Sequence, residues 1–239
     1  MKILLFDIDG TLMLSGGAGR RAMDRAFFEI HGIENAFDGI APYGKTDPAI
    51  FTEIFSNHGL GDDVGDEEIR PVADLYTRYL PEEVRTSTGA ELMPGVAPLL
   101  DHLAGLDAVV LGLLTGNFER TARTKLSRFD LNRYFSFGAF GSDDGDRVRL
   151  VPVALRRAAA HTGRTIAAGP HVVVIGDTPR DVECALVHGA TAVGVATTHY
   201  TIDDLQAAGA HHVFQDLANT AQFTRALDLD EPDPPDSTT

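Results

Sequence analysis

The stretch MKILLFDIDGT, residues 1–11, decides how the rest of this chain is interpreted. Residues 3–6 form a short apolar run, which is typical of a strand buried on both faces of a parallel sheet. Asp7 and Asp9 follow this run, two positions apart. Because side chains alternate along an extended chain, we expect both carboxylates to face one spot at the carboxyl end of the strand. Open parallel sheets bind their ligands at that edge.

Two close carboxylates are costly unless a cation or a shared proton lies between them. Oxygen ligands are those that Mg²⁺ prefers, so one interpretation of Asp7 and Asp9 is a magnesium site. The competing interpretation is a simple turn, since Asp and Gly commonly end strands. Residues 1–11 alone leave both interpretations open.

Composition narrows the classes of function. The chain has 239 residues, 44% of them apolar, and a formal net charge of −15. This charge argues against nucleic-acid partners and anionic membrane surfaces. The charge would also repel an anionic substrate, so any phosphate site would need locally concentrated positive charge. The single cysteine, Cys184, excludes an internal disulfide and fits a reducing compartment. With no signal peptide and no apolar stretch of membrane-spanning length, we expect a cytoplasmic protein.

Two later apolar runs, 108–114 and 171–175, also end in polar residues and are each followed by a predicted helix. The polar residues that follow them are Thr115, Asn117, Asp177 and Asp181. Together with residues 1–11, these runs place carboxylates and a hydroxyl at one edge of the predicted sheet. A threonine hydroxyl there can donate to a phosphate oxygen, and the neighbouring helix N-termini also favour an anion.

The pattern of elements predicts two structural units. From residue 86 onward strands alternate with helices, which is typical of a doubly wound α/β fold with a parallel sheet. Residues 15–85 carry helical periodicity and no strand, so they are predicted to be an all-helical cap inserted after the first strand. The predicted core comprises 1–14 and 86–228. The Asp- and Pro-rich segment 229–239 is predicted to be disordered.

Three motifs resemble those of the haloacid dehalogenase superfamily, in the branch near phosphoglycolate phosphatase and β-phosphoglucomutase. They are Asp7-x-Asp9-Gly10-Thr11, Thr115-Gly116-Asn117 and Gly176-Asp177-x-x-x-Asp181. The resemblance covers residues 1–227 and implies a Rossmann-like α/β core with a helical cap over residues 15–85.

By this resemblance Asp7 is the nucleophile that becomes an aspartyl-phosphate, and Asp9 is the general acid and base. Mg²⁺ is held by the Asp7 side chain, the Asp9 carbonyl and Asp177. Asp181 supports these ligands without touching the ion.

The third motif of the family usually supplies a lysine, and residues 146–152 contain none. The only lysines are Lys2, Lys45 and Lys125. We therefore expect an arginine to neutralise the site, Arg147 by its distance to the following helix, with Arg149 as the alternative. A guanidinium presents a planar fork in place of a point charge.

Other residues are predicted to contact the substrate. Thr115 with the Gly116 and Asn117 amides is expected to hold the phosphate oxygens. Lys45 falls in a cap loop that resembles the family's specificity loop, and the competing interpretation is an exposed surface lysine. Two weaker candidates are Arg20 and Arg21.

These expectations favour a Mg²⁺-dependent phosphomonoesterase that acts on a small phosphorylated metabolite, phosphoglycolate-like or a sugar phosphate. The alternatives are a phosphomutase of the β-phosphoglucomutase type, a haloacid dehalogenase and a non-catalytic binding protein. Asp9 and Asp177 count against the dehalogenase, which lacks the second aspartate and needs no metal. Monomer and dimer are equally compatible with the sequence.

Overall fold

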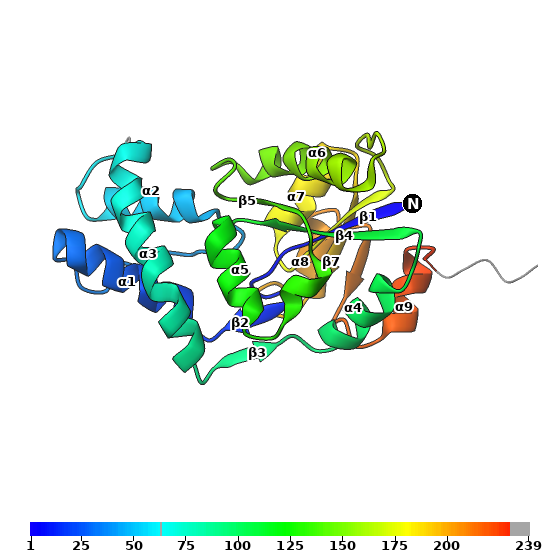
Figure 1. Cartoon of the computed structure of the whole chain (residues 1–239), viewed down its shortest axis with the longest axis horizontal. Helices are drawn as coiled ribbons and strands as arrows, with labels where there is room; N and C mark the ends of the chain where they lie inside the picture. The colour runs from blue at the N-terminus through cyan, green and yellow to red at the C-terminus, as the bar shows by residue number, and fades with distance from the viewer. Residues whose placement is uncertain (63, 230–239) are drawn as a thin grey trace, which may run out of the picture.

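A parallel six-stranded sheet forms the centre of the computed structural model, which describes residues 1–62 and 64–229 (Figure 1). The spatial order is β5-β4-β1-β6-β7-β8, and every pairing in it is parallel. The strands are β1 (Lys2–Phe6), β4 (Val109–Thr115), β5 (Gly138–Phe140), β6 (Val172–Gly176), β7 (Thr191–Val195) and β8 (His212–Phe214). The predicted doubly wound α/β fold is confirmed.

Helices cover both faces of this sheet. One face carries α4 (Val96–Ala104), α5 (Glu119–Ser127) and α9 (Thr220–Ala226). The other carries α6 (Leu150–Thr162), α7 (Pro179–Val187) and α8 (Ile202–Ala207). Alternate residues of β1 enter the two hydrophobic layers, Leu4 and Phe6 on the first face and Ile3 and Leu5 on the second. The continuous apolar run of β1 thus follows from its burial on both faces.

Three further helices form a separate layer beside the sheet, at the left of Figure 1. They are α1 (Ala18–His31), α2 (Asp47–Asn57) and α3 (Asp66–Thr86). Their apolar faces meet in a hydrophobic cluster of their own, with Phe27, Phe51 and Tyr76 fully buried within it. All three helices begin after residue 15, and α3 ends at Thr86. The division into a core and a cap at 15–85 stays a prediction.

Two short strands join this helical layer to the sheet. β2 (Met13–Ser15) precedes α1, and β3 (Ala90–Leu92) follows α3. They pair in antiparallel fashion, with Met13 opposite Leu92 and Ser15 opposite Ala90. The chain therefore leaves the α/β part and returns to it at one place.

The end of the described chain packs on the core. Leu229, predicted to begin the disordered tail, is buried in the hydrophobic cluster with α4 and α9. The remainder of that predicted tail, 230–239, lies outside the described residues. Within 1–62 and 64–229, no helix combines the length and apolarity needed to cross a membrane.

Candidate active site

Three polar strand ends meet at the middle of the sheet. Asp7 follows β1, Thr115 ends β4, and Asp177 follows β6. β1 lies between β4 and β6, with Phe6 in register with Leu113 on one side and Ile175 on the other. The chain builds the sheet outward in opposite directions from β1, so this edge is a topological switch point.

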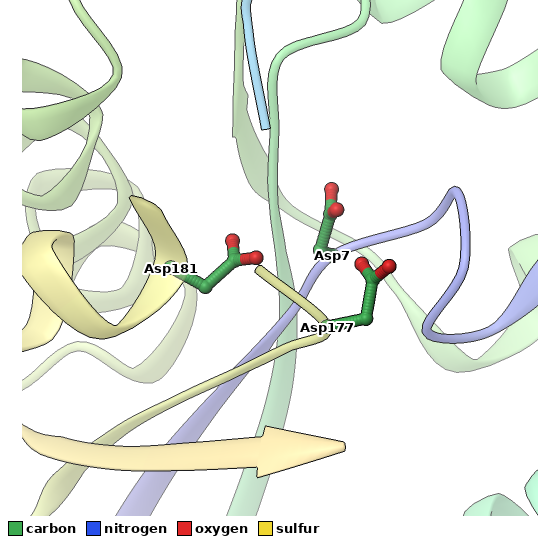
Figure 2. Close-up of side chains that lie close together, drawn as sticks. All are labelled: Asp7, Asp177 and Asp181. Atoms are coloured by element: carbon green, nitrogen blue, oxygen red, sulfur yellow. The ribbon is translucent and has the colours of Figure 1, made fainter. Parts of the chain in front are cut away.

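Three buried carboxylates gather there. Asp7, Asp177 and Asp181 each offer an oxygen within 4.8 Å of the others. Figure 2 shows Asp7 and Asp177 side by side, with Asp181 approaching from α7. Burial, reinforced by Asp181 and Asp7, raises the pKa of Asp177 to about 8. Burial also raises the pKa of Asp7 to about 6, although the neighbouring Arg147 opposes the shift. This excess of negative charge fits a divalent cation with oxygen ligands.

Neighbouring residues fix the position of the Asp177 carboxylate. Thr11 Oγ1 donates to Asp177 Oδ1 at 3.4 Å, and Thr198 Oγ1 donates to Asp177 Oδ2. Gly10 has φ of 85°, in the left-handed region, and a Cβ there would lie 2.7 Å from Asp177 Cγ. The glycine therefore supplies both the turn and the space for the carboxylate.

Both carboxylate oxygens of Asp181 accept hydrogen bonds from neighbouring residues. Its Oδ2 accepts from the Thr178 backbone N–H at 3.1 Å and from Thr178 Oγ1 at 2.8 Å. Its Oδ1 accepts from Arg147 Nη2. With both oxygens engaged, Asp181 is placed to hold its neighbours in position.

The structure separates the two candidate arginines. The Arg147 side chain is 6% exposed, and its Nη2 lies 3.1 Å from Asp7 Oδ1 as well as contacting Asp181. The Arg149 side chain is 72% exposed and pairs loosely with Asp144 and Asp146. Of these two arginines, only Arg147 reaches the carboxylates of the buried cluster, Asp7 and Asp181. Its role in a reaction stays a prediction.

A second buried cation, Lys125, was missed by the sequence reasoning. Lys125 Nζ lies 2.6 Å from Asp9 Oδ2 and 2.6 Å from Asn117 Oδ1. Asn117 Nδ2 in turn donates to Asp9 Oδ2 at 2.8 Å and to Thr115 Oγ1 at 2.8 Å. The feature of the sequence that could have indicated Lys125 is its position next to Leu126, on the inward face of α5. Long helical side chains point back toward the helix N-terminus, which here is the strand-end edge.

The segment before α2 rests directly on the second motif. Asp47 N donates to Gly116 O at 2.7 Å, and a Cβ on Gly116 would lie 2.8 Å from Thr46 Cα and closer still to the Lys45 carbonyl oxygen. Asp47 Oδ2 accepts from the Phe118 N–H at 2.9 Å. The helical layer thus touches the loop that is predicted to bind phosphate.

The predicted cap cations are already paired within the helical layer. Lys45 forms an ion pair with Glu53 of α2. Arg20 pairs with Asp38 and, at 3.7 Å, with Asp24. Arg21 Nε lies 2.8 Å from Glu83 Oε2. Lys45 and Arg20 also line a cavity between the helical layer and the strand-end edge. Contact of either residue with a substrate stays a prediction.

A cavity of about 590 Å³ lies between the strand-end edge and the helical layer. Its floor contains Asp7, Asp9, Asp177 and residues 115–117. Its opposite wall comes from the helical layer and the loop before α2, and is largely apolar. The apolar and aromatic members of this wall are Met23, Phe37, Ile40, Ile50 and Tyr76, and the same side of the cavity also carries Arg20, Tyr43, Lys45 and Asp47. A volume of this size accommodates a small organic ligand together with a phosphate.

Known proteins share this fold. The family model for haloacid dehalogenase-like hydrolases matches residues 1–189. Tyrosine-protein kinase PtkA of Mycobacterium tuberculosis is 27% identical over 238 residues, which cover 96% of this chain and 70% of the relative.

Two solved structures illustrate the likeness. A putative β-phosphoglucomutase from Bacteroides vulgatus has a TM-score of 0.66 at 20% identity, covering 95% of this chain and 89% of its own. A predicted phosphoglycolate phosphatase from Haemophilus somnus has a TM-score of 0.66 at 16% identity, covering 94% and 98%. At these identities the likeness concerns the fold.

The geometry defines a class of protein. Its members have a parallel α/β sheet with an acid cluster at the switch point and a helical layer above that cluster. The chain belongs to the haloacid dehalogenase-like hydrolases. The sequence-based predictions that the chain belongs to this superfamily and that it is an enzyme are confirmed.

Proposed function

We propose that the chain is a Mg²⁺-dependent phosphomonoesterase that hydrolyses a small phosphorylated molecule through an aspartyl-phosphate on Asp7. The observation that carries the proposal is the buried cluster of Asp7, Asp177 and Asp181 beside Arg147, in which Asp7, Asp177 and Arg147 line the cavity. This cluster combines a nucleophile, oxygen ligands for a cation and a fixed positive charge within one site.

The donor set fits Mg²⁺. The cluster offers only oxygen atoms, and of its three carboxylates Asp7 and Asp177 line the cavity. These two with the Asp9 carbonyl would hold the ion, which would neutralise charge on the phosphoryl oxygens. Asp181, with its oxygens occupied by Thr178 and Arg147, supports the other carboxylates.

The reaction divides into two displacements. An Asp7 oxygen attacks phosphorus, the bond from phosphorus to the leaving oxygen breaks, and Asp9 gives that oxygen a proton. Water then attacks the aspartyl-phosphate while Asp9 takes its proton, which breaks the bond between Asp7 and phosphorus. Inorganic phosphate leaves, and both carboxyl groups return to their starting states.

Positive and polar groups around Asp7 favour the transferring phosphoryl group. Arg147 offsets the charge of Asp7 and of the phosphate oxygens, in the place where the family has lysine. The Thr115 hydroxyl with the Gly116 and Asn117 amides binds the non-bridging oxygens. Lys125 and Asn117 hold the Asp9 side chain beside them.

The test is hydrolysis of p-nitrophenyl phosphate with and without Mg²⁺. We expect activity that EDTA abolishes and that Asp7→Asn lacks, while Asp203→Asn, which removes an exposed carboxylate, stays active. Mass spectrometry of acid-quenched enzyme should detect a phosphoryl group on Asp7. A folded chain that releases phosphate from none of a panel of metabolite phosphates would contradict the proposal and favour a non-catalytic binding protein.

Two other phosphoryl transfers give different results in the same assay. A phosphomutase requires a bisphosphate such as glucose 1,6-bisphosphate and releases little phosphate. The Mycobacterium tuberculosis relative is named a tyrosine-protein kinase, and 27% identity over 96% of this chain makes that reaction a second candidate. Transfer from ATP to a tyrosine peptide, measured beside phosphate release, distinguishes it.

A further inference from the structure

The wall of the cavity that faces the acid cluster is apolar and aromatic. Met23 comes from α1, Phe37 and Ile40 from the loop before α2, Ile50 from α2 and Tyr76 from α3. All five are also members of the hydrophobic cluster of the helical layer. In a phosphomonoester bound at Asp7, the leaving group is the part that projects from the phosphate toward this wall.

The positively charged side chains that line this cavity are already paired with carboxylates. Arg20 and Lys45 pair with carboxylates of the helical layer. Lys125 pairs with Asp9, and Arg147 with Asp7 and Asp181. Among residues 1–62 and 64–229, no lysine or arginine lines the cavity without a carboxylate partner. A second anionic group on the substrate would have to separate one of these pairs.

Polar side chains also line the cavity near this wall, among them Asp47, Tyr76 and Tyr43. Asp47 lines the cavity with a buried carboxylate, which repels an anionic leaving group. The Tyr76 hydroxyl is fully buried and makes no hydrogen bond to the described residues. Tyr43 stacks on His199 with ring centroids 3.8 Å apart. A polyhydroxylated sugar would lose hydrogen bonds to water here that this wall does not replace.

We infer that the substrate carries an uncharged aromatic leaving group, bound between the acid cluster and the wall of Met23, Phe37, Ile40, Ile50 and Tyr76. This inference rests on the proposed function, and in place of the phosphoglycolate-like or sugar-phosphate substrate expected from the sequence it assigns an aromatic phosphomonoester. Aromatic rings and the Met23 thioether favour ring contacts, and a buried ring gains from every apolar atom removed from water.

The first test compares three primary alkyl phosphomonoesters, so that leaving-group reactivity is matched. They are benzyl phosphate, 2-phosphoglycolate and glucose 6-phosphate. We expect kcat/KM for benzyl phosphate to exceed the other two by about 100-fold or more, because several buried apolar groups contribute. An equal or higher value for 2-phosphoglycolate or glucose 6-phosphate would overturn the inference.

A binding measurement separates failure of the inference from failure of the proposed function. Titration calorimetry compares 2-phenylethylphosphonate with 3-phosphonopropionate, which are non-hydrolysable analogues of the benzyl and glycolate esters. We expect at least tenfold tighter binding of the phenyl compound. That result without turnover of any ester would refute the phosphatase but keep the aromatic site. Turnover with tighter binding of the carboxylate compound would refute the aromatic site alone.

A pair of variants tests the wall itself. Ile40→Lys places an unpaired cation in the cavity, so the preference for the phenyl compound should fall by at least tenfold. Ile30→Lys is the matched control, because Ile30 is 40% exposed on α1 and is not among the lining residues. Circular dichroism checks that both variants fold. An unchanged preference in folded Ile40→Lys would contradict the inference, and the wild-type comparisons decide it independently of folding.

Discussion

Gly116→Ala should push the helical layer away from the strand-end edge. A Cβ at Gly116 would lie 2.8 Å from Thr46 Cα and 2.9 Å from the Lys45 carbonyl carbon, and ordinary contact begins at 3.4 Å. These neighbours are backbone, and the Lys45 carbonyl oxygen would lie closer still, so the segment must retreat by more than the roughly 0.6 Å that separates 2.8 from 3.4 Å. The Gly116 backbone lies outside the left-handed region, so alanine adopts it without strain and the contact alone decides the effect.

The retreat affects hydrogen bonds as well as packing. It lengthens the 2.7 Å bond from Asp47 N to Gly116 O and moves the Asp47 carboxylate away from the Phe118 N–H, now at 2.9 Å. Overpacking costs about 1–3 kcal/mol, and a weakened buried hydrogen bond costs about 1 kcal/mol more. We expect Gly116→Ala to lower the free energy of unfolding by about 2–4 kcal/mol.

Urea unfolding followed by circular dichroism measures this loss. Gly145→Ala is the matched control in the same contact region, because its Cβ would meet only Pro48 Cβ, at 3.9 Å. We expect the control to unfold within about 0.5 kcal/mol of the wild type. If Gly116→Ala matched both of them, the close contact between the helical layer and the second motif would not exist in solution.

Three further predictions test the charges of the site. Arg147→Met should lower kcat by about 100-fold or more and Arg149→Met should not; the reverse result would transfer the role to Arg149. Mg²⁺ at 100 times its Kd should raise the free energy of unfolding by about 2.7 kcal/mol, and the same shift in Asp177→Asn would contradict the metal site. Burial raises the pKa of Asp47 from 3.8 to about 6 although Lys125 opposes the shift, so the folded chain binds a proton that the unfolded chain releases. Between pH 7 and pH 5 the wild type should therefore gain about 1.4 kcal/mol of stability that Asp47→Asn lacks, and parallel pH profiles in urea unfolding would refute this.

The fold was predictable because its strands are encoded locally. The apolar run before Asp7 and the run before Asp177 are continuous and short, as burial on both faces requires. Parallel strands present their carboxyl ends at one edge, so the convergence of Asp7 and Asp177 follows from topology. β2 and β3 were not predicted, since three residues are too few to show a period.

The rest of the site depends on side-chain direction and on distant partners. Arg147 and Arg149 lie in one 3₁₀ turn, where residues two apart point about 120° from each other, so only one can face inward. The spacing in sequence does not say which. Lys125 reaches Asp9 across 116 positions of the chain, and Lys45 is neutralised by Glu53 of α2. Such pairings arise only once the helices have packed.

The β2–β3 ribbon has a consequence for how this enzyme's selectivity can change. Ser15 and Ala90 are directly paired, so everything between them begins and ends at neighbouring points in space. A longer, shorter or differently shaped segment inserted between these two residues leaves the order and register of the six parallel strands untouched. The groups that we propose act on phosphorus and most of those that we propose select what is attached to it are thus encoded in separate stretches, so natural or laboratory variation can alter one set while preserving the other.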